Sequence, residues 1–217
     1  MRRAVGCLPV LWLAACATAP QRPSNPAPIP TTVEALAAAI SADSQRSDHE
    51  PDSKIRDELA TEAVRDAEAC LALEPQAAAC LYGHAVALGL QTKAHPARAG
   101  DLLKKMLDAL TNAEAADPNY DHAGPSRVRA LLLIRAPGWP LGPGDSDAGL
   151  EAARRAVALQ PQYPPNLLAL GEALAKTGDG KGSREYYELA RGAAKSFDPG
   201  TDRDDWLREA DQALQPK

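Results

Sequence analysis

The stretch Gln160–Ala190, QPQYPPNLLALGEALAKTGDGKGSREYYELA, contains one complete helix–turn–helix unit. The prolines near its start stop a helix from entering from upstream, because proline lacks the N–H and clashes with the preceding turn. Apolar residues then recur at helical spacing from Leu167 to Leu174, until Thr177-Gly178-Asp179-Gly180 breaks the run. A second amphipathic pattern covers Ser183 to Gly192, so the stretch predicts a helical hairpin.

Short tags that contain proline repeat along the chain. Glu74-Pro75-Gln76, Asp117-Pro118-Asn119 and Gln160-Pro161-Gln162 follow one another at intervals of 43 residues, and Asp198-Pro199-Gly200 comes 38 residues later. Self-similarity at a fixed period indicates a helical-repeat array whose units bury their apolar faces against neighbours. We therefore predict an all-α fold, with roughly three to four irregular helical-hairpin repeats over residues 31–217 and a C-terminal capping helix.

The quoted stretch resembles the tetratricopeptide repeat. The positions that meet the family pattern are Leu167, Leu170-Gly171, Leu174, Gly178-Asp179, Tyr187 and Ala190. Ser183, where the family usually has alanine, departs from it. The period is longer than the family's 34 residues, which predicts longer loops between helices.

Several helix starts are predicted from capping signals. Thr31-Thr32-Val33-Glu34 fits a capping box, and the polar run Ser41–Asp52 is expected to end that helix, with Ser44–Glu50 as a possible loop. Ser53 is expected to cap a helix to about Leu73. Thr201-Asp202-Arg203-Asp204 has a similar pattern before the last helix.

The N-terminus has the pattern of an export signal. Arg2 and Arg3 precede a short apolar run, and Leu13-Ala14-Ala15-Cys16 resembles the lipobox of bacterial lipoproteins. This resemblance implies a signal peptide over 1–15, lipid on Cys16, a proline-rich tether over 16–30 and a place on the periplasmic face of the outer membrane. The alternative is an ordinary signal peptide cut after Ala17-Thr18-Ala19.

Cys70 and Cys80 lie five residues before and five after Pro75. They therefore fall at matching heights on two predicted antiparallel helices, where a disulfide is geometrically reasonable. The alternative is two buried thiols that act as small apolar side chains.

The sequence predicts neither an enzyme nor a metal or cofactor site. Its four histidines are scattered, and the zinc, redox-dithiol, nucleophile-elbow and phosphate-loop motifs are absent. Asp121 and His122 are the only candidates for a hydrolase assembled from loops. The formal charge of −5, without a basic stripe, argues against nucleic acid as a partner.

Residues 135–145, RAPGWPLGPGD, cannot be helical because three prolines and three glycines surround Trp139. A long loop that carries an aromatic residue is often functional. Alternatively, Trp139 fills a gap between helices.

A binding groove is the remaining candidate site. With Trp139, the groove-facing positions carried over from the tetratricopeptide family are Tyr82, Val86, Leu90, His122, Arg129, Leu132, Leu133, Leu168 and Glu172. This mostly apolar lining suits a hydrophobic small molecule or an amphipathic helix. Alternatively, extra helices fill the groove and the leucines are core residues.

The lipobox, Ala123-Gly124-Pro125, the segment Arg135–Pro140 and Leu150-Glu151 together resemble the T-component of tripartite ATP-independent periplasmic (TRAP) transporters, over roughly Glu68–Ala194. The resemblance implies a lipid-anchored periplasmic protein that docks the transporter's substrate-binding protein, forms homo-oligomers and helps to move a ligand, including an apolar one. The alternative is a tetratricopeptide scaffold lipoprotein for outer-membrane or pilus assembly.

Overall fold

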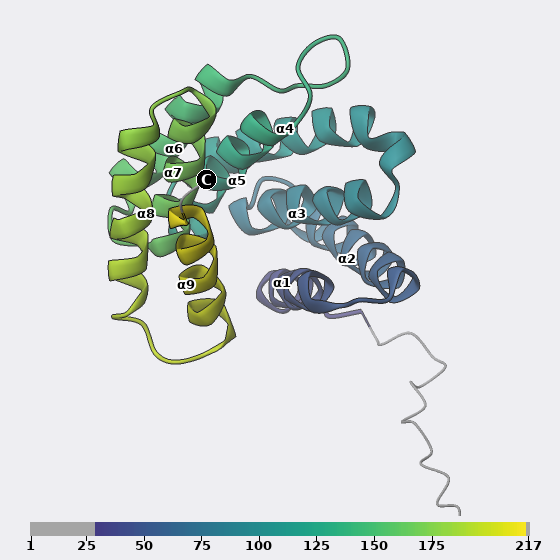
Figure 1. Cartoon of the computed structure of the whole chain (residues 1–217). Helices are drawn as coiled ribbons and strands as arrows, with labels where there is room; N and C mark the ends of the chain where they lie inside the picture. The colour runs from purple at the N-terminus through teal and green to yellow at the C-terminus, as the bar shows by residue number, and fades with distance from the viewer. Residues whose placement is uncertain (1–28, 216–217) are drawn as a thin grey trace, which may run out of the picture.

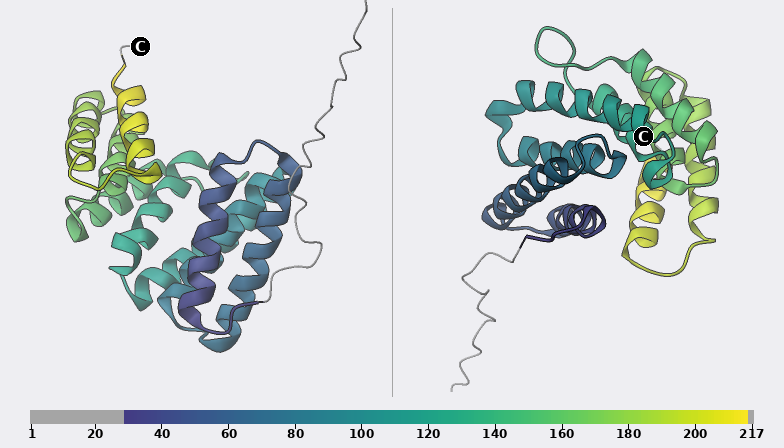
Figure 2. Two further views of the ribbon diagram at one scale, coloured as in Figure 1. Left: turned by 90° about the horizontal axis from the view of Figure 1, so that it is seen from below. Right: turned by 180° about the vertical axis from the view of Figure 1, so that it is seen from behind.

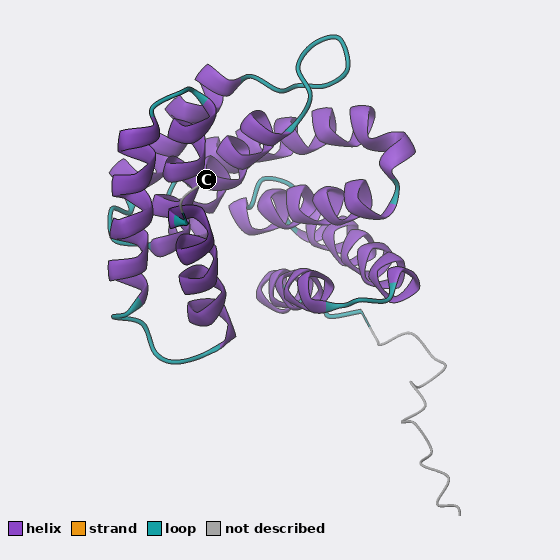
Figure 3. Ribbon diagram, in the orientation of Figure 1, coloured by secondary structure: helices purple, strands orange, loops and turns teal. Residues whose placement is uncertain are grey.

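The computed structural model describes residues 29–215, and within that range the regular structure is helical (Figure 3). The elements are α1 (Val33–His49), α2 (Ser53–Leu73), α3 (Ala78–Ala94), the short 3₁₀ helix η1 (Pro96–Arg98), α4 (Ala99–Ala116), α5 (Tyr120–Arg135), α6 (Ser146–Leu159), α7 (Pro164–Lys176), α8 (Gly180–Ala194) and α9 (Thr201–Leu214). The predicted all-α helical-repeat array is confirmed. The predicted signal peptide, lipidated Cys16 and nearly all of the tether lie outside the described residues.

Neighbouring helices pack as hairpins, and α1–α4 and α6–α9 form two groups joined through α5 (Figures 1 and 2). The end of α1 approaches the start of α9, where His49 Nε2 lies 3.0 Å from Asp205 Oδ2. The two ends of the array therefore meet through side chains.

Helix α1 packs on α3 as well as on α2. The approach is close at Gly83, where an added Cβ would lie 2.9 Å from Ile40 Cδ1. Ile40 and Leu90 share one buried cluster. Helix α1 therefore covers the face of α3 that the sequence assigned to a groove.

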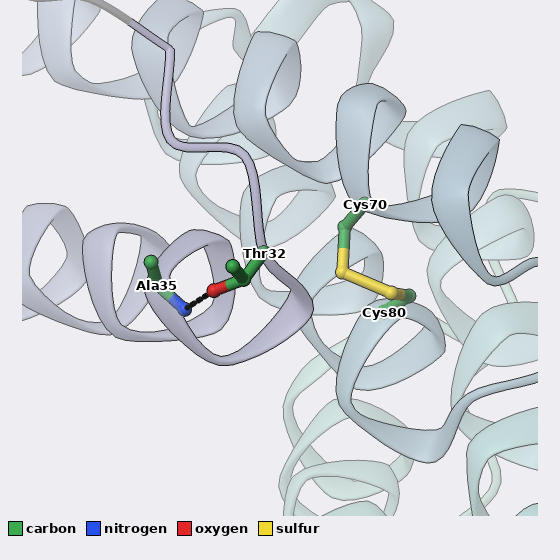
Figure 4. Close-up of a disulfide and its surroundings, with 4 residues drawn as sticks. All are labelled: Thr32, Ala35, Cys70 and Cys80. Atoms are coloured by element: carbon green, nitrogen blue, oxygen red, sulfur yellow. Dashed lines mark hydrogen bonds between the residues drawn. A yellow bond between two sulfur atoms is a disulfide. The ribbon is translucent and has the colours of Figure 1, made fainter.

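Three predicted helix starts differ from the structure. The hydroxyl of Thr32, not Thr31, accepts from the backbone N–H of Ala35 at 3.3 Å (Figure 4). Asp52, not Ser53, caps α2 by accepting from the N–H of Lys54. Helix α9 already begins at Thr201, which the sequence pattern placed at the cap. The N-cap is therefore Gly200, which has no side chain to cap the helix.

The first helix ends inside the predicted polar run Ser41–Asp52, but the alternative of a loop over Ser44–Glu50 is wrong. Helix α1 runs through the polar segment to His49, and its buried residues include Asp43 and Ser47. Asp43 and Ser47 follow Ile40 at helical spacing, so the buried face of the helix continues past Ile40. Packing of this face on neighbouring helices therefore extends the helix through a polar segment.

Cys70 and Cys80 form a disulfide between α2 and α3, with an S–S distance of 2.07 Å (Figure 4). Both cysteines are fully buried, and Leu36 of α1 packs against them. The disulfide therefore lies under α1 and belongs to the core of the first hairpin.

Candidate functional site

Helix α5 opens with a left-handed turn. Asp121, His122 and Ala123 have φ angles of 47°, 54° and 63°. The segment directly follows the tag Asp117-Pro118-Asn119 and the tyrosine after it. Such conformations are uncommon for residues other than glycine and persist where the surroundings enforce them.

The side chain of Arg127, only 8% exposed, holds this turn from inside. Its Nη2 donates to Asp121 Oδ2 at 2.7 Å, and its Nη1 donates to the carbonyl oxygens of Asp121 and His122 at 3.2 and 3.4 Å. The hydroxyl of Tyr82 donates to the same carboxylate oxygen at 2.9 Å. The guanidinium thus has a partner for its charge and also donates to two backbone carbonyls of the turn.

The pKa values of this cluster follow from its burial. Burial raises the pKa of Tyr82, with Arg127 opposing the rise and Asp121 supporting it. Burial alone would lower the pKa of Arg127, but Tyr82 and Asp121 raise it above its ordinary value. Arg127 therefore stays charged and Tyr82 stays protonated at neutral pH.

Asn166, at the start of α7, is fully buried and joins this turn to the next one. Its Oδ1 accepts from Arg127 at 3.2 Å. Its Nδ2 donates to the carbonyls of His122 at 3.0 Å and Gln160 at 3.3 Å. One amide therefore fixes two successive inter-repeat turns relative to each other.

Aromatic rings extend from these turns toward the C-terminal helices. The rings of His122 and Tyr163 stack with centroids 4.4 Å apart. Tyr163, Phe197 and Trp206 then contact one another edge to face, at 5.3 to 6.3 Å between centroids. Burial raises the pKa of Tyr163, with Arg127 opposing the rise and Asp121 and Asp202 adding to it.

Beside these rings lies a cavity of about 920 Å³ that opens to solvent. We call it the C-terminal cavity. Its lining residues are His122, Gln160, Pro161, Gln162, Tyr163, Leu167, Glu185, Glu188, Leu189, Gly192, Ala193, Ser196 and Phe197. The cavity is therefore built from two inter-repeat turns, the start of α7 and one face of α8.

The residues predicted to line a groove do not line the C-terminal cavity, except for His122. Leu90, Leu132, Leu133 and Leu168 are buried in core clusters. Tyr82 and Val86 border a smaller cleft of about 170 Å³ against α1. For these residues the filled-groove alternative describes the structure, because packing of helix on helix covers their faces.

The two predicted charged groove residues are engaged in ion pairs. Arg129 Nη1 lies 3.1 Å from Glu114 Oε2, and the same carboxylate accepts from Arg155 Nε at 2.8 Å. Arg135 Nε donates to Glu172 Oε1 at 2.7 Å. These contacts tie α4, α5, α6 and α7 together.

Trp139 does not fill a gap between helices, because 91% of it is exposed. It lies in the loop between α5 and α6, which protrudes from the array (Figure 1). The Gly144 N–H donates to the Pro137 carbonyl at 2.9 Å and holds the two sides of the loop together. The prolines and glycines close the loop on itself and leave Trp139 outside.

The sequence contained a partial signal for the C-terminal cavity. The tag Gln160-Pro161-Gln162 and the tyrosine that follows it form one wall, but in the sequence the tag indicates only the repeat period. The contribution of Glu185 had no such signal, because the amphipathic pattern of this helix leaves its position to solvent. Leu189 belongs to the apolar stripe of the same pattern, which predicts packing against other helices, yet it is 50% exposed beside the cavity.

Comparisons with known proteins found similarity to solved structures but to no family model or curated protein. No protein-family model matches the sequence, and no curated protein matches it. Similar solved structures include a crystal structure of MamA, with a TM-score of 0.49, 18% identity and coverage of 76% of this chain and 80% of that one. A second MamA crystal structure has a TM-score of 0.46, 15% identity and coverage of 77% and 90%. These similarities are too low to bear on function.

No helix among residues 29–215 is long and apolar enough to cross a bilayer. In the same part of the chain, no three histidine, cysteine, aspartate or glutamate side chains group as they would around a metal ion.

Proposed function

We propose that this protein is a non-catalytic docking protein that holds a segment of a protein partner in the C-terminal cavity. The observation that carries the proposal is the lining of this cavity, where Leu189 and Phe197 are 50% and 37% exposed. Large apolar side chains gathered around a hollow are typical of interaction sites rather than of ordinary surface.

The specific role we propose is that of a lipid-anchored periplasmic accessory of a TRAP-type transporter. The lipobox at Cys16 and the segment Arg135–Pro140 support this role by resemblance. The partner is then the transporter's substrate-binding protein, and the cavity is also large enough for an apolar small molecule.

Co-purification from native membranes tests this role. The tagged full-length chain is expected to retain a TRAP substrate-binding protein, and Leu189→Ser is expected to weaken that retention. Leu73→Ser is the matched control, because Leu73 is 52% exposed and lies on α2, outside the cavity lining.

Recovery of barrel-assembly or pilus subunits in place of a transporter protein favours the scaffold alternative. A partner whose retention is equal in the Leu189→Ser and Leu73→Ser variants contradicts docking at the cavity. Unchanged circular dichroism of both variants ensures that the comparison concerns the surface and not folding.

A further inference from the structure

The C-terminal cavity has an apolar floor and an acidic rim. Leu167 and Tyr163 form part of its base, and Leu189 and Phe197 extend into solvent beside it. Glu185 and Glu188 are exposed, one helical turn apart on α8. Among the described lining residues there is no lysine and no arginine.

A third carboxylate adds to the negative potential on this side. Asp202, near the start of α9, is close enough to contribute to the raised pKa of Tyr163. The guanidinium of Arg127 lies over the Tyr163 ring, 5.3 Å from its centroid, and is paired with Asp121. The Asp121 carboxylate therefore offsets most of the positive potential that Arg127 would produce in the cavity.

Lys181 and Arg184 precede Glu185 and Glu188 by four residues on α8, but among the described residues no ion pair joins them to these carboxylates. Arg191 faces α9, where its Nη1 lies 3.5 Å from Asp211 Oδ1. Lys195 is exposed but is not among the lining residues. An entering group therefore meets apolar carbon at the base and carboxylates at the edge.

We infer that the occupant of the cavity is a protein segment that carries lysine or arginine side chains next to a bulky apolar residue. This inference rests on the proposed docking function and specifies the chemistry of the partner. The long stem of a lysine or arginine lies on Leu189 while its charged end reaches Glu185 or Glu188 in solvent. The apolar residue of the segment packs against Tyr163 and Leu167.

Two synthetic probes test the inference: a short amphipathic helical peptide of leucine and lysine, and its leucine and glutamate counterpart. Binding is measured by fluorescence anisotropy with the full chain carrying Cys16→Ala, which prevents lipid attachment and lies outside the described fold. The lysine peptide is expected to bind more tightly, with an affinity that falls as salt is added.

Charge variants then assign the effect to the rim. Glu185→Gln with Glu188→Gln is expected to weaken the lysine peptide by roughly fivefold to tenfold, as expected for two exposed ion pairs. The control is Glu74→Gln with Glu151→Gln, which removes the same charge at exposed positions outside the cavity lining and is expected to leave the affinity unchanged.

Three outcomes overturn the inference. If both peptides bind equally and Leu189→Ser weakens both, the cavity is a docking site but has no preference for cationic segments. An equal loss in the rim and control variants reduces the effect to net charge. Binding of neither peptide rejects the occupant, and the docking function is then decided by co-purification alone.

Discussion

Arg127 Nη2 lies 2.7 Å from the carboxylate of Asp121, six residues earlier in the chain. Between them the backbone passes from a left-handed to a right-handed helical conformation. Within the left-handed turn, the Asp121 carboxylate and the carbonyls of Asp121 and His122 all accept hydrogen bonds from Arg127. The same turn carries His122 into the wall of the C-terminal cavity. The buried pair therefore links the fold of α5 to the shape of the candidate site.

Asp121→Asn is expected to lower the free energy of unfolding by about 1 to 3 kcal/mol, because it leaves the buried Arg127 without its charged partner. Asparagine accepts left-handed backbone angles as well as aspartate does, so the conformational preference is kept. The measurement is the midpoint of urea denaturation. Asp108→Asn, at an exposed position on α4, is the control, and equal midpoints for the two variants would contradict the role of the pair.

The stability of the first helix is expected to depend on pH through Asp43. Burial raises the pKa of this carboxyl from 3.8 to about 6, with Glu62 adding to the rise and Arg46 opposing it. The folded chain thus holds the proton more tightly than the unfolded chain. The stability it contributes is fully present below about pH 3.8 and is lost as the pH rises through about 6.

Asp43→Asn stays neutral and is expected to raise the free energy of unfolding at pH 7 by about 1 to 2 kcal/mol, allowing for partial access of solvent. It is also expected to flatten the dependence of stability on pH across this window. Urea titrations at several pH values measure both effects. Asp101→Asn on α4 is the control, and a pH profile of Asp43→Asn that matches the parent would reject this assignment.

Loss of the disulfide is expected to destabilise the chain. The bridge closes a short loop between Cys70 and Cys80, which corresponds to roughly 3 kcal/mol of lost entropy in the unfolded state. Cys70→Ala with Cys80→Ala is expected to lower the thermal midpoint, and dithiothreitol is expected to lower that of the parent. If the reductant shifts the double variant as much as the parent, the effect does not come from this bridge.

Two glycines are expected to respond to alanine with opposite sign. At Gly171 an added Cβ would lie 3.1 Å from the Tyr187 ring, so Gly171→Ala is expected to cost about 1 kcal/mol as α7 and α8 move apart. At Gly192, inside α8, an added Cβ meets nothing within 4 Å, and Gly192→Ala is expected to stabilise by about 0.5 to 1 kcal/mol. Chemical denaturation of both variants tests the pair, and a shift of the same sign would contradict it.

The repeat architecture was determined by local features of the sequence. The prolines of each tag, the Gly178-Asp179 turn and the spacing of Leu167, Leu170 and Leu174 act within one hairpin, so they predicted α7 and α8 without knowledge of neighbours. The positions of Cys70 and Cys80 around Pro75 likewise placed them side by side, because the height of a residue on a hairpin depends only on its distance from the turn.

The candidate site was decided by contacts between units. Leu132 and Leu133 occupy groove positions in the repeat pattern, yet they are core residues because other helices pack over them. The hollow instead forms where the turns at His122 and Tyr163 are held together by Arg127 and Asn166, which lie 39 residues apart in the sequence. Periodicity reports which face of a helix is apolar, but only the packed chain decides whether another helix, a partner or solvent meets that face.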